Sequence, residues 1–305
     1  MKLYDQIIQR IPIHKGWSGD RKFCAVTSEG SRYLLRFSPV ERLEFKRREF
    51  EKMQEVAALG IPMCLPLEFG TCEEGVYSIQ SWVDGEDAEG ILMTLPEDAQ
   101  YHYGLDAGKI LAKIHTVKAP VDIPDWETRF NAKIDRKIAM YEVCELKYEG
   151  GEAFLRYLAE NRHLLKGRPQ TYQHGDYHVG NMMLDRGGDL TVIDFDRYDF
   201  GDPWEEFNRI VWCAQAAPAF ATGMVDGYFD GPVPMEFWRL LALYISSNAL
   251  SSLPWAVDFG EKEIQVMRNQ AAEILQWYAG MTHIVPTWYR RPKENSGCPQ
   301  RKPLV

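Results

Sequence analysis

The sequence lacks most features that mark secreted, membrane-bound or nucleic-acid-binding proteins. Its 6 cysteines form no Cys-x-x-Cys pair, so their spacing indicates neither a zinc site nor a disulfide framework and favours a reduced cytoplasmic setting. The N-terminus lacks the long apolar core of a signal peptide. No segment repeats internally. Acidic residues outnumber basic ones by 44 to 35, and the net charge of −9 argues against a nucleic-acid partner and suits a cationic small molecule.

Long hydrophobic runs are also missing. The most apolar segment, residues 237–257, includes Arg239, Asn248, Pro254 and four serines, which predicts a buried helix and no membrane partner. With 305 residues and 45% apolar composition, the chain can bury a substantial core and has room for two lobes.

One short stretch carries recognisable chemistry. Residues 174–181 read His-Gly-Asp-Tyr-His-Val-Gly-Asn, and Asp194 follows Asn181 by thirteen residues. Apolar residues on both sides of the turn at 185–189 predict a β-hairpin between them. Because the chain leaves on one strand and returns on the next, this hairpin would bring Asn181 and Asp194 together.

These residue types suit phosphoryl transfer. A γ-phosphoryl group needs hard oxygen ligands for Mg²⁺ and a base that faces the acceptor hydroxyl. Asn181 and Asp194 supply the oxygen ligands, and Asp176 supplies the base on a loop that Gly175 allows to turn sharply. The pattern therefore predicts a Mg²⁺-dependent enzyme that uses ATP or GTP.

The 174–181 segment, Asp194 with its neighbours through Asp196, and the run Gly-Asp-Pro-Trp-Glu-Glu-Phe at 201–207 resemble the aminoglycoside phosphotransferase family of small-molecule kinases. The resemblance extends from about residue 15 to about residue 280. It implies an α+β, bilobal protein-kinase-like fold with a small antiparallel-sheet N-lobe and a larger, mostly helical C-lobe. It also implies that Asp176 is catalytic and that Asn181 and Asp194 bind the metal.

We expect the N-lobe to span residues 1–83, with a hinge at about 80–84, and the C-lobe to span 84–282. In the N-lobe, strands at 23–27 and 33–37 form the first predicted hairpin. In the turn before this hairpin, Ser18 and Gly19 could offer backbone N–H groups to phosphates, although an ordinary turn would have the same sequence.

A helix is predicted after Ser38, which would cap it, and Gly60 would end it. Kinases pair a helix Glu with a strand Lys that holds phosphates, and here Arg36 and Glu49 occupy those places. Lys22, on the preceding strand, is the alternative phosphate contact. A solvent-exposed strand face and a surface ion pair would explain the same residues.

The hinge supplies the nucleotide-contact candidates Gln80, Ser81, Trp82 and Val83, although Trp82 could equally lie in the core. Beyond it, helices are predicted at 103–115, at 128–165 in two pieces, and at 204–280. Residues 283–305 are basic and rich in proline, which predicts a loosely ordered tail.

Five carboxylates on the C-lobe are candidates for attracting a cationic acceptor: Asp199, Asp202, Glu205, Asp226 and Asp230. A structural role in holding the loop to the helices is favoured for Asp202 and for Glu206. The predicted acceptor is an aminoglycoside or another cationic small molecule. The alternatives are a metabolite kinase of choline, amino sugar or homoserine type, and a non-catalytic nucleotide- or ligand-binding protein.

Overall fold

The computed structural model describes residues 2–14 and 19–292. These residues form two compact units. The N-terminal unit contains the described residues up to Ala88 together with Asn181–Tyr198, and the C-terminal unit contains Glu89–Gly180 and the described residues from Asp199 onward. The hairpin at 181–198 therefore packs with the N-terminal unit, whereas we expected the whole of 84–282 to form one lobe.

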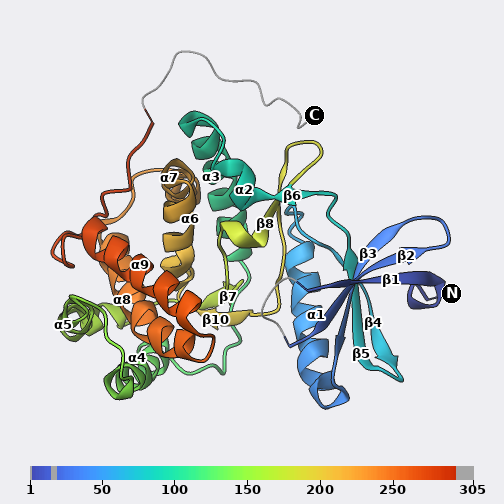
Figure 1. Cartoon of the computed structure of the whole chain (residues 1–305), viewed down its shortest axis with the longest axis horizontal. Helices are drawn as coiled ribbons and strands as arrows, with labels where there is room; N and C mark the ends of the chain where they lie inside the picture. The colour runs from blue at the N-terminus through green and yellow to red at the C-terminus, as the bar shows by residue number, and fades with distance from the viewer. Residues whose placement is uncertain (1, 15–18, 293–305) are drawn as a thin grey trace. The chain divides into compact units, whose positions relative to one another are not determined.

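A five-stranded antiparallel sheet forms the centre of the N-terminal unit (Figure 1). The strands are β1 (Ile7–Ile13), β2 (Arg21–Thr27), β3 (Arg32–Ser38), β4 (Pro66–Cys72) and β5 (Gly75–Ser81), in the order β1-β2-β3-β5-β4. A short 3₁₀ turn at Tyr4–Gln6 precedes them. Alternate apolar residues of β2, β3 and β5 point to one face and form a core that includes Leu35, Phe37, Tyr77 and Ile79.

Helix α1 (Leu43–Ala57) lies between β3 and β4 in the chain, after a 3₁₀ turn at Val40–Arg42. The predicted cap at Ser38 is wrong. Ser38 is the last residue of β3, and its hydroxyl donates to Asp20 at 2.6 Å. The helix begins only at Leu43, and Arg42 occupies the N-cap position. The predicted end of the helix at Gly60 is close to the observed one. The helix ends three residues before Gly60, which has a left-handed φ of 67°.

The predicted hairpin is present. Strands β6 (Gly85–Asp87), β8 (Met182–Asp185) and β9 (Leu190–Val192) form a small sheet in the order β6-β8-β9. At its open end, the Ile193 N–H donates to the Asn181 carbonyl at 3.0 Å. The hairpin thus places Asn181 beside the residue that precedes Asp194.

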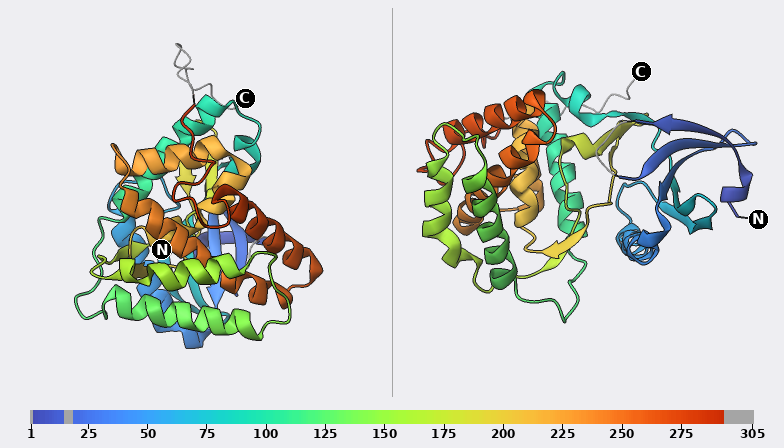
Figure 2. Two further views of the ribbon diagram at one scale, coloured as in Figure 1. Left: turned by 90° about the vertical axis from the view of Figure 1, so that its left-hand side faces the viewer. Right: turned by 60° about the horizontal axis from the view of Figure 1, so that its bottom comes forward.

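The C-terminal unit is mostly helical (Figure 2). Its helices are α2 (Ala88–Leu92, whose first residue belongs to the N-terminal unit), α3 (Glu97–Ile114), α4 (Trp126–Val143), α5 (Glu152–Asn161), α6 (Ile210–Ala216), α7 (Pro218–Phe229), α8 (Met235–Val257) and α9 (Glu261–Trp277). Short 3₁₀ turns lie at Arg162–Leu165, Val179–Asn181 and Glu205–Arg209, and strands β7 (Thr171–Gln173) and β10 (Asp199–Gly201) pair antiparallel. Helices α3 and α7 meet closely, since a Cβ on Gly104 would lie 2.1 Å from the Phe220 carbonyl oxygen.

Helix α8 contains the apolar segment predicted to be a buried helix. By length and composition alone it could cross a membrane, but 67% of its most apolar window is buried inside the protein. Leu240, Leu241 and Leu243 are fully buried within it, as expected of a core helix in a helical unit.

The prediction of a loosely ordered tail is wrong for the part of the tail that the structure describes. Residues 283–292 pack onto the C-terminal unit, where Trp288 is only 6% exposed. Tyr289 donates to Asp226 at 2.6 Å, and the Arg291 guanidinium contacts the same carboxylate at 2.7 and 3.0 Å. Composition alone did not reveal these anchors, because two aromatic residues and one paired cation outweigh the polar character of the segment.

Candidate active site

The His-Gly-Asp loop is fixed by a carboxylate from another part of the chain. Gly175 has a φ of 84°, which a residue without a Cβ adopts at little cost. Its N–H donates to both carboxylate oxygens of Glu206 at 3.1 Å, and the Tyr177 N–H donates to one of them at 3.3 Å. The Tyr177 hydroxyl reaches the Ala107 carbonyl at 2.7 Å. Backbone amides and a buried tyrosine thus set the position of Asp176.

Glu206 can do this because its charge is compensated. Burial opposes the ionised form, but His115, His174 and the Gly175 amide hold the pKa of Glu206 below its ordinary value. A buried carboxylate that accepts several N–H groups is a rigid anchor. Glu206 therefore has the structural role that the sequence favoured for it.

Asp176 lies among polar and cationic side chains of the C-terminal unit, and its own side chain is 16% exposed. One of its oxygens is 3.2 Å from Nε of Arg209 and 3.6 Å from Nε2 of His178. Nδ1 of His178 in turn accepts the Gly180 N–H at 3.1 Å. The carboxylate is thus held from two sides while part of it stays open to solvent.

The two predicted metal ligands lie in the N-terminal unit. Asn181 begins the hairpin and Asp194 follows β9. Asp194 has a φ of 66°, a conformation that non-glycine residues adopt rarely and that clusters at functional sites. Among the residues described, no group of three or more His, Cys, Asp or Glu side chains could hold a metal unaided. Two oxygen ligands fit Mg²⁺, which keeps waters and binds substrate phosphates besides one or two protein ligands.

Arg36 is the centre of a buried ion cluster. Its side chain is 3% exposed, and its guanidinium contacts Asp194 at 2.8 Å, Asp196 at 2.5 Å and Asp20 at 3.2 Å. Although burial opposes the charge, Asp194, Asp196 and Asp20 hold the pKa of Arg36 above its ordinary value. The planar guanidinium can bridge several carboxylates at once, which a lysine ammonium does less well.

The predicted Arg36–Glu49 ion pair is replaced by another. Glu49 pairs with Lys46, three residues earlier on α1, at 3.0 Å, and Lys46 also contacts Asp20 at 2.8 Å. Burial raises the pKa of Glu49 to about 7 despite Lys46. Asp20 and Lys46 therefore stand between the two residues that we expected to pair.

Lys22 lies directly opposite Arg36 in the β2–β3 register. Opposed residues of antiparallel strands point to the same face, and Nζ of Lys22 is 3.9 Å from Asp194. Two cations in such a pair repel unless anions lie beside them. Both candidates for phosphate contact thus face the same carboxylate.

The remaining nucleotide candidates divide between two faces. Ser81, Trp82 and Val83 line a pocket of about 320 Å³ together with Met63 and Thr191. Gln80 is buried and does not line this pocket. Its Oε1 has no hydrogen-bond partner among the described residues. Gly19 is exposed with open space around it, whereas Ser18 lies outside the described residues.

The five C-lobe carboxylates do not form an open acidic rim. Asp202 is fully buried and receives two N–H groups of Arg168 at 2.7 and 3.0 Å. Asp226 binds Arg291, and Asp199 lies 3.2 Å from Arg129. Glu205 pairs with Lys133 at 3.1 Å. The exposed Asp230 ends α7 with a left-handed φ of 45°.

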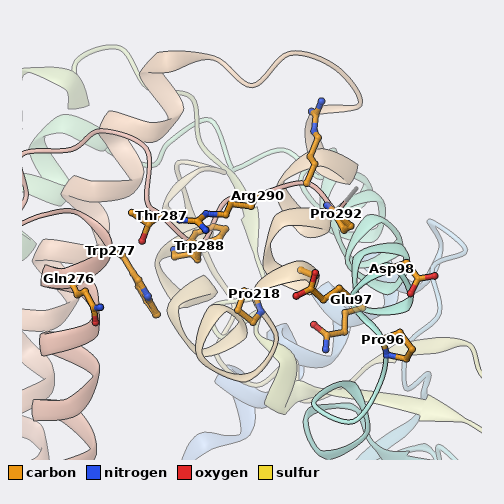
Figure 3. Close-up of a pocket in the computed structure, with 13 residues that line it drawn as sticks. Pro96, Glu97, Asp98, Pro218, Gln276, Trp277, Thr287, Trp288, Arg290 and Pro292 are labelled. Atoms are coloured by element: carbon orange, nitrogen blue, oxygen red, sulfur yellow. The ribbon is translucent and has the colours of Figure 1, made fainter. Parts of the chain in front are cut away.

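A larger cavity, of about 950 Å³, lies in the C-terminal unit (Figure 3). It is bounded by the starts of α3 and α7, the end of α9 and the packed segment after Thr287. Trp277 and Trp288 lie on one side and Glu97 and Asp98 on the other (Figure 3). None of the residues predicted for the site lines this cavity, so its size alone does not make it the active site.

Sequence reasoning missed four charged residues that shape the site. Asp20 and Lys46 complete the Arg36 cluster, while Arg209 and Lys133 bring positive charge to the region of Asp176 and Glu205. The only local signal was the spacing of three between Lys46 and Glu49. The other partners are distant in sequence and leave no local pattern.

Comparison with known proteins gives one family. A model described as the phosphotransferase enzyme family matches residues 10–238. The chain matches none of the curated proteins with which it was compared.

Three solved structures illustrate the likeness in fold. The apo form of a thermostable mutant of aminoglycoside phosphotransferase APH(4)-Ia is 18% identical, with a TM-score of 0.66, covering 91% of this chain and 97% of that one. A choline/ethanolamine kinase family protein from Mesorhizobium loti is 16% identical, with a TM-score of 0.64 and 90% of each chain covered. The gentamicin complex of APH(2")-IIa is 16% identical, with a TM-score of 0.60, covering 92% and 95%. The predicted bilobal kinase-like fold is confirmed.

Proposed function

Because this chain belongs to the phosphotransferase enzyme family, we propose that it transfers the γ-phosphoryl group of ATP or GTP to a hydroxyl of a small molecule. One observation carries the proposal: Asp176 is held on a loop fixed by Glu206, five residues before the oxygen ligand Asn181. A catalytic carboxylate, an Asn and a further Asp are the parts that phosphoryl transfer requires.

Asp176 accepts the proton of the acceptor hydroxyl. A bond forms between the hydroxyl oxygen and the γ-phosphorus, and the bond from that phosphorus to the β–γ bridging oxygen breaks. Arg209, 3.2 Å from Asp176, and His178, 3.6 Å from it, keep the carboxylate oriented. General base catalysis of this kind contributes roughly 10²–10⁴-fold.

Asn181 and Asp194 are the residues that would hold Mg²⁺. When bound, Mg²⁺ offsets the phosphate charge and helps to position the γ-phosphoryl group. Arg36 and Lys22 face Asp194 from adjacent strands, and they are the two candidates for contact with the phosphates. Ser81 to Val83, at the predicted hinge, are the candidates for base contact.

Aminoglycosides are the first acceptors to test, since similar structures include ternary complexes of APH(4)-Ia with hygromycin B and a gentamicin complex. A metabolite kinase is the second candidate, supported by the choline/ethanolamine kinase family structure. Both ATP and GTP are candidates for the phosphoryl donor, since similar structures include an ADP complex and a GDP complex. The alternative that is not an enzyme is a non-catalytic protein that binds a nucleotide or another ligand.

The test is a phosphoryl-transfer screen with Mg²⁺ and either ATP or GTP. The acceptors are hygromycin B, gentamicin, choline, ethanolamine, an amino sugar and homoserine, and the product is identified by mass spectrometry. Asp176→Asn is the matched control, because it keeps the shape of the side chain and removes the base. Nucleotide binding without transfer to any hydroxyl compound would favour the non-catalytic binder.

A further inference from the structure

The region beside Asp176 contains more positive charge than the neighbouring carboxylates compensate. Lys133 and Lys137 lie four residues apart and so on one face of α4. Lys133 pairs with Glu205 at 3.1 Å, and Arg209 pairs with Asp176 at 3.2 Å. All five residues belong to the C-terminal unit.

Lys137 takes part in neither of these ion pairs. It makes no hydrogen bond or ion pair with any residue that the structure describes. Burial, with repulsion from Lys133, Arg209 and Arg136, lowers the pKa of Lys137 to about 7, against the attraction of Glu205. Lys137 is partly exposed to solvent, and an anion that approaches its ammonium would stabilise the charged form further.

Arg209 also has bonding capacity to spare. Its Nε is buried and, within the described part of the chain, forms no properly aligned hydrogen bond, although it lies 3.2 Å from Asp176. Buried donors without an acceptor are rare because each costs free energy. Lys137, which has no partner among the described residues, and the buried Nε of Arg209, which has no well-aligned acceptor there, therefore indicate that an anion binds in this region.

We propose that the acceptor carries a carboxylate or phosphate group that lies against Lys137, with Lys133 and Arg209 beside it. This rests on the proposed function, because it concerns the molecule whose hydroxyl Asp176 faces. Such a group would anchor the acceptor on α4 and leave its hydroxyl free for the carboxylate. A polycationic aminoglycoside would meet like charges here, while the acids that could attract it are paired internally.

The first experiment measures anion binding without needing the true acceptor. Inorganic phosphate and malonate are titrated against the full chain in saturating Mg²⁺ and AMP-PNP, so that phosphate sites for the nucleotide are filled. Lys137→Met is compared with the wild type and with Lys113→Met, which removes an exposed lysine from α3. Stabilisation is followed by thermal unfolding, and the concentration dependence gives Kd.

We expect phosphate or malonate to bind the wild type and Lys113→Met alike, and to bind Lys137→Met at least about 30-fold more weakly. Equal binding to all three proteins, or no binding to the wild type, overturns the proposal. The choice between phosphate and malonate identifies the source of the anionic group. If AMP-PNP does not stabilise the protein, that result contradicts the proposed function instead. The phosphate and malonate titrations still decide whether an anion binds at Lys137.

The second experiment compares acceptors that differ only in the anionic group. Homoserine is paired with aminopropanol, glycerate with ethylene glycol, and a pentose phosphate with the free pentose. We expect transfer to at least one acid at a rate more than about tenfold above its uncharged partner, with a raised KM in Lys137→Met and little change in kcat. Preference for the partner without the acid, or for an aminoglycoside, overturns the proposal.

Discussion

Arg36 offers the most direct test of how the N-terminal unit holds its charges. Arg36→Ala removes a guanidinium that is 3% exposed and contacts Asp194 at 2.8 Å and Asp196 at 2.5 Å. Asp20 keeps Lys46 and Ser38, but Asp196, whose side chain is only 10% exposed, loses this ion pair. Breaking a buried pair from one side costs about 3–5 kcal/mol, because a carboxylate is left uncompensated.

We expect Arg36→Ala to lower the free energy of unfolding by that amount and Tm by roughly 5–8 °C. Arg36→Lys keeps the charge but not the planar fork, so about 1–3 kcal/mol should be lost. Arg32→Ala is the matched control on the same strand, since its ion pair with Asp84 is 41% and 45% exposed and is worth no more than about 1 kcal/mol.

Urea unfolding followed by circular dichroism gives these values. The account of the cluster fails if Arg36→Ala stays within about 1 kcal/mol of Arg32→Ala. Nucleotide titration of Lys22→Ala and Arg36→Ala, below their unfolding temperatures, then separates the two phosphate candidates. The variant with the larger loss of Mg²⁺–nucleotide affinity identifies the phosphate contact.

Three further predictions concern single residues. Asp176→Asn should lower kcat by roughly 10²–10⁴-fold with nucleotide affinity kept, and more than about a tenth of wild-type kcat would contradict the base role. Asp194→Ala should abolish the Mg²⁺ dependence of nucleotide affinity in titrations with and without the metal, and an unchanged dependence would exclude it as a ligand. Since the folded pKa of Lys137 is lowered from 10.5 to about 7, the contribution of Lys137 to stability should fall as pH falls from 10.5 to 7. Lys137→Met should therefore be about 2–4 kcal/mol more stable below pH 7, with no gain near pH 11, as read by unfolding at each pH.

The sequence by itself determined the local features of this protein. The His-Gly-Asp loop, the hairpin between Asn181 and Asp194, and the buried helix α8 all follow from residues close together in the chain. Turn residues, alternating apolar positions and helical periodicity act over a few residues, so one sequence is enough to read them.

Only the tertiary structure decided which charges pair. Arg36 finds its partners 158 and 160 residues away, in Asp194 and Asp196, and not in Glu49. The same holds for Asp226, which binds Tyr289 and Arg291. Periodicity tells which residues face the core, but a long charged side chain can reach several partners, and only the folded geometry and the local cost of burying charge select among them. For that reason the sequence supplied the catalytic and metal-binding candidates, whereas the charge of the surroundings of Asp176 came from the fold.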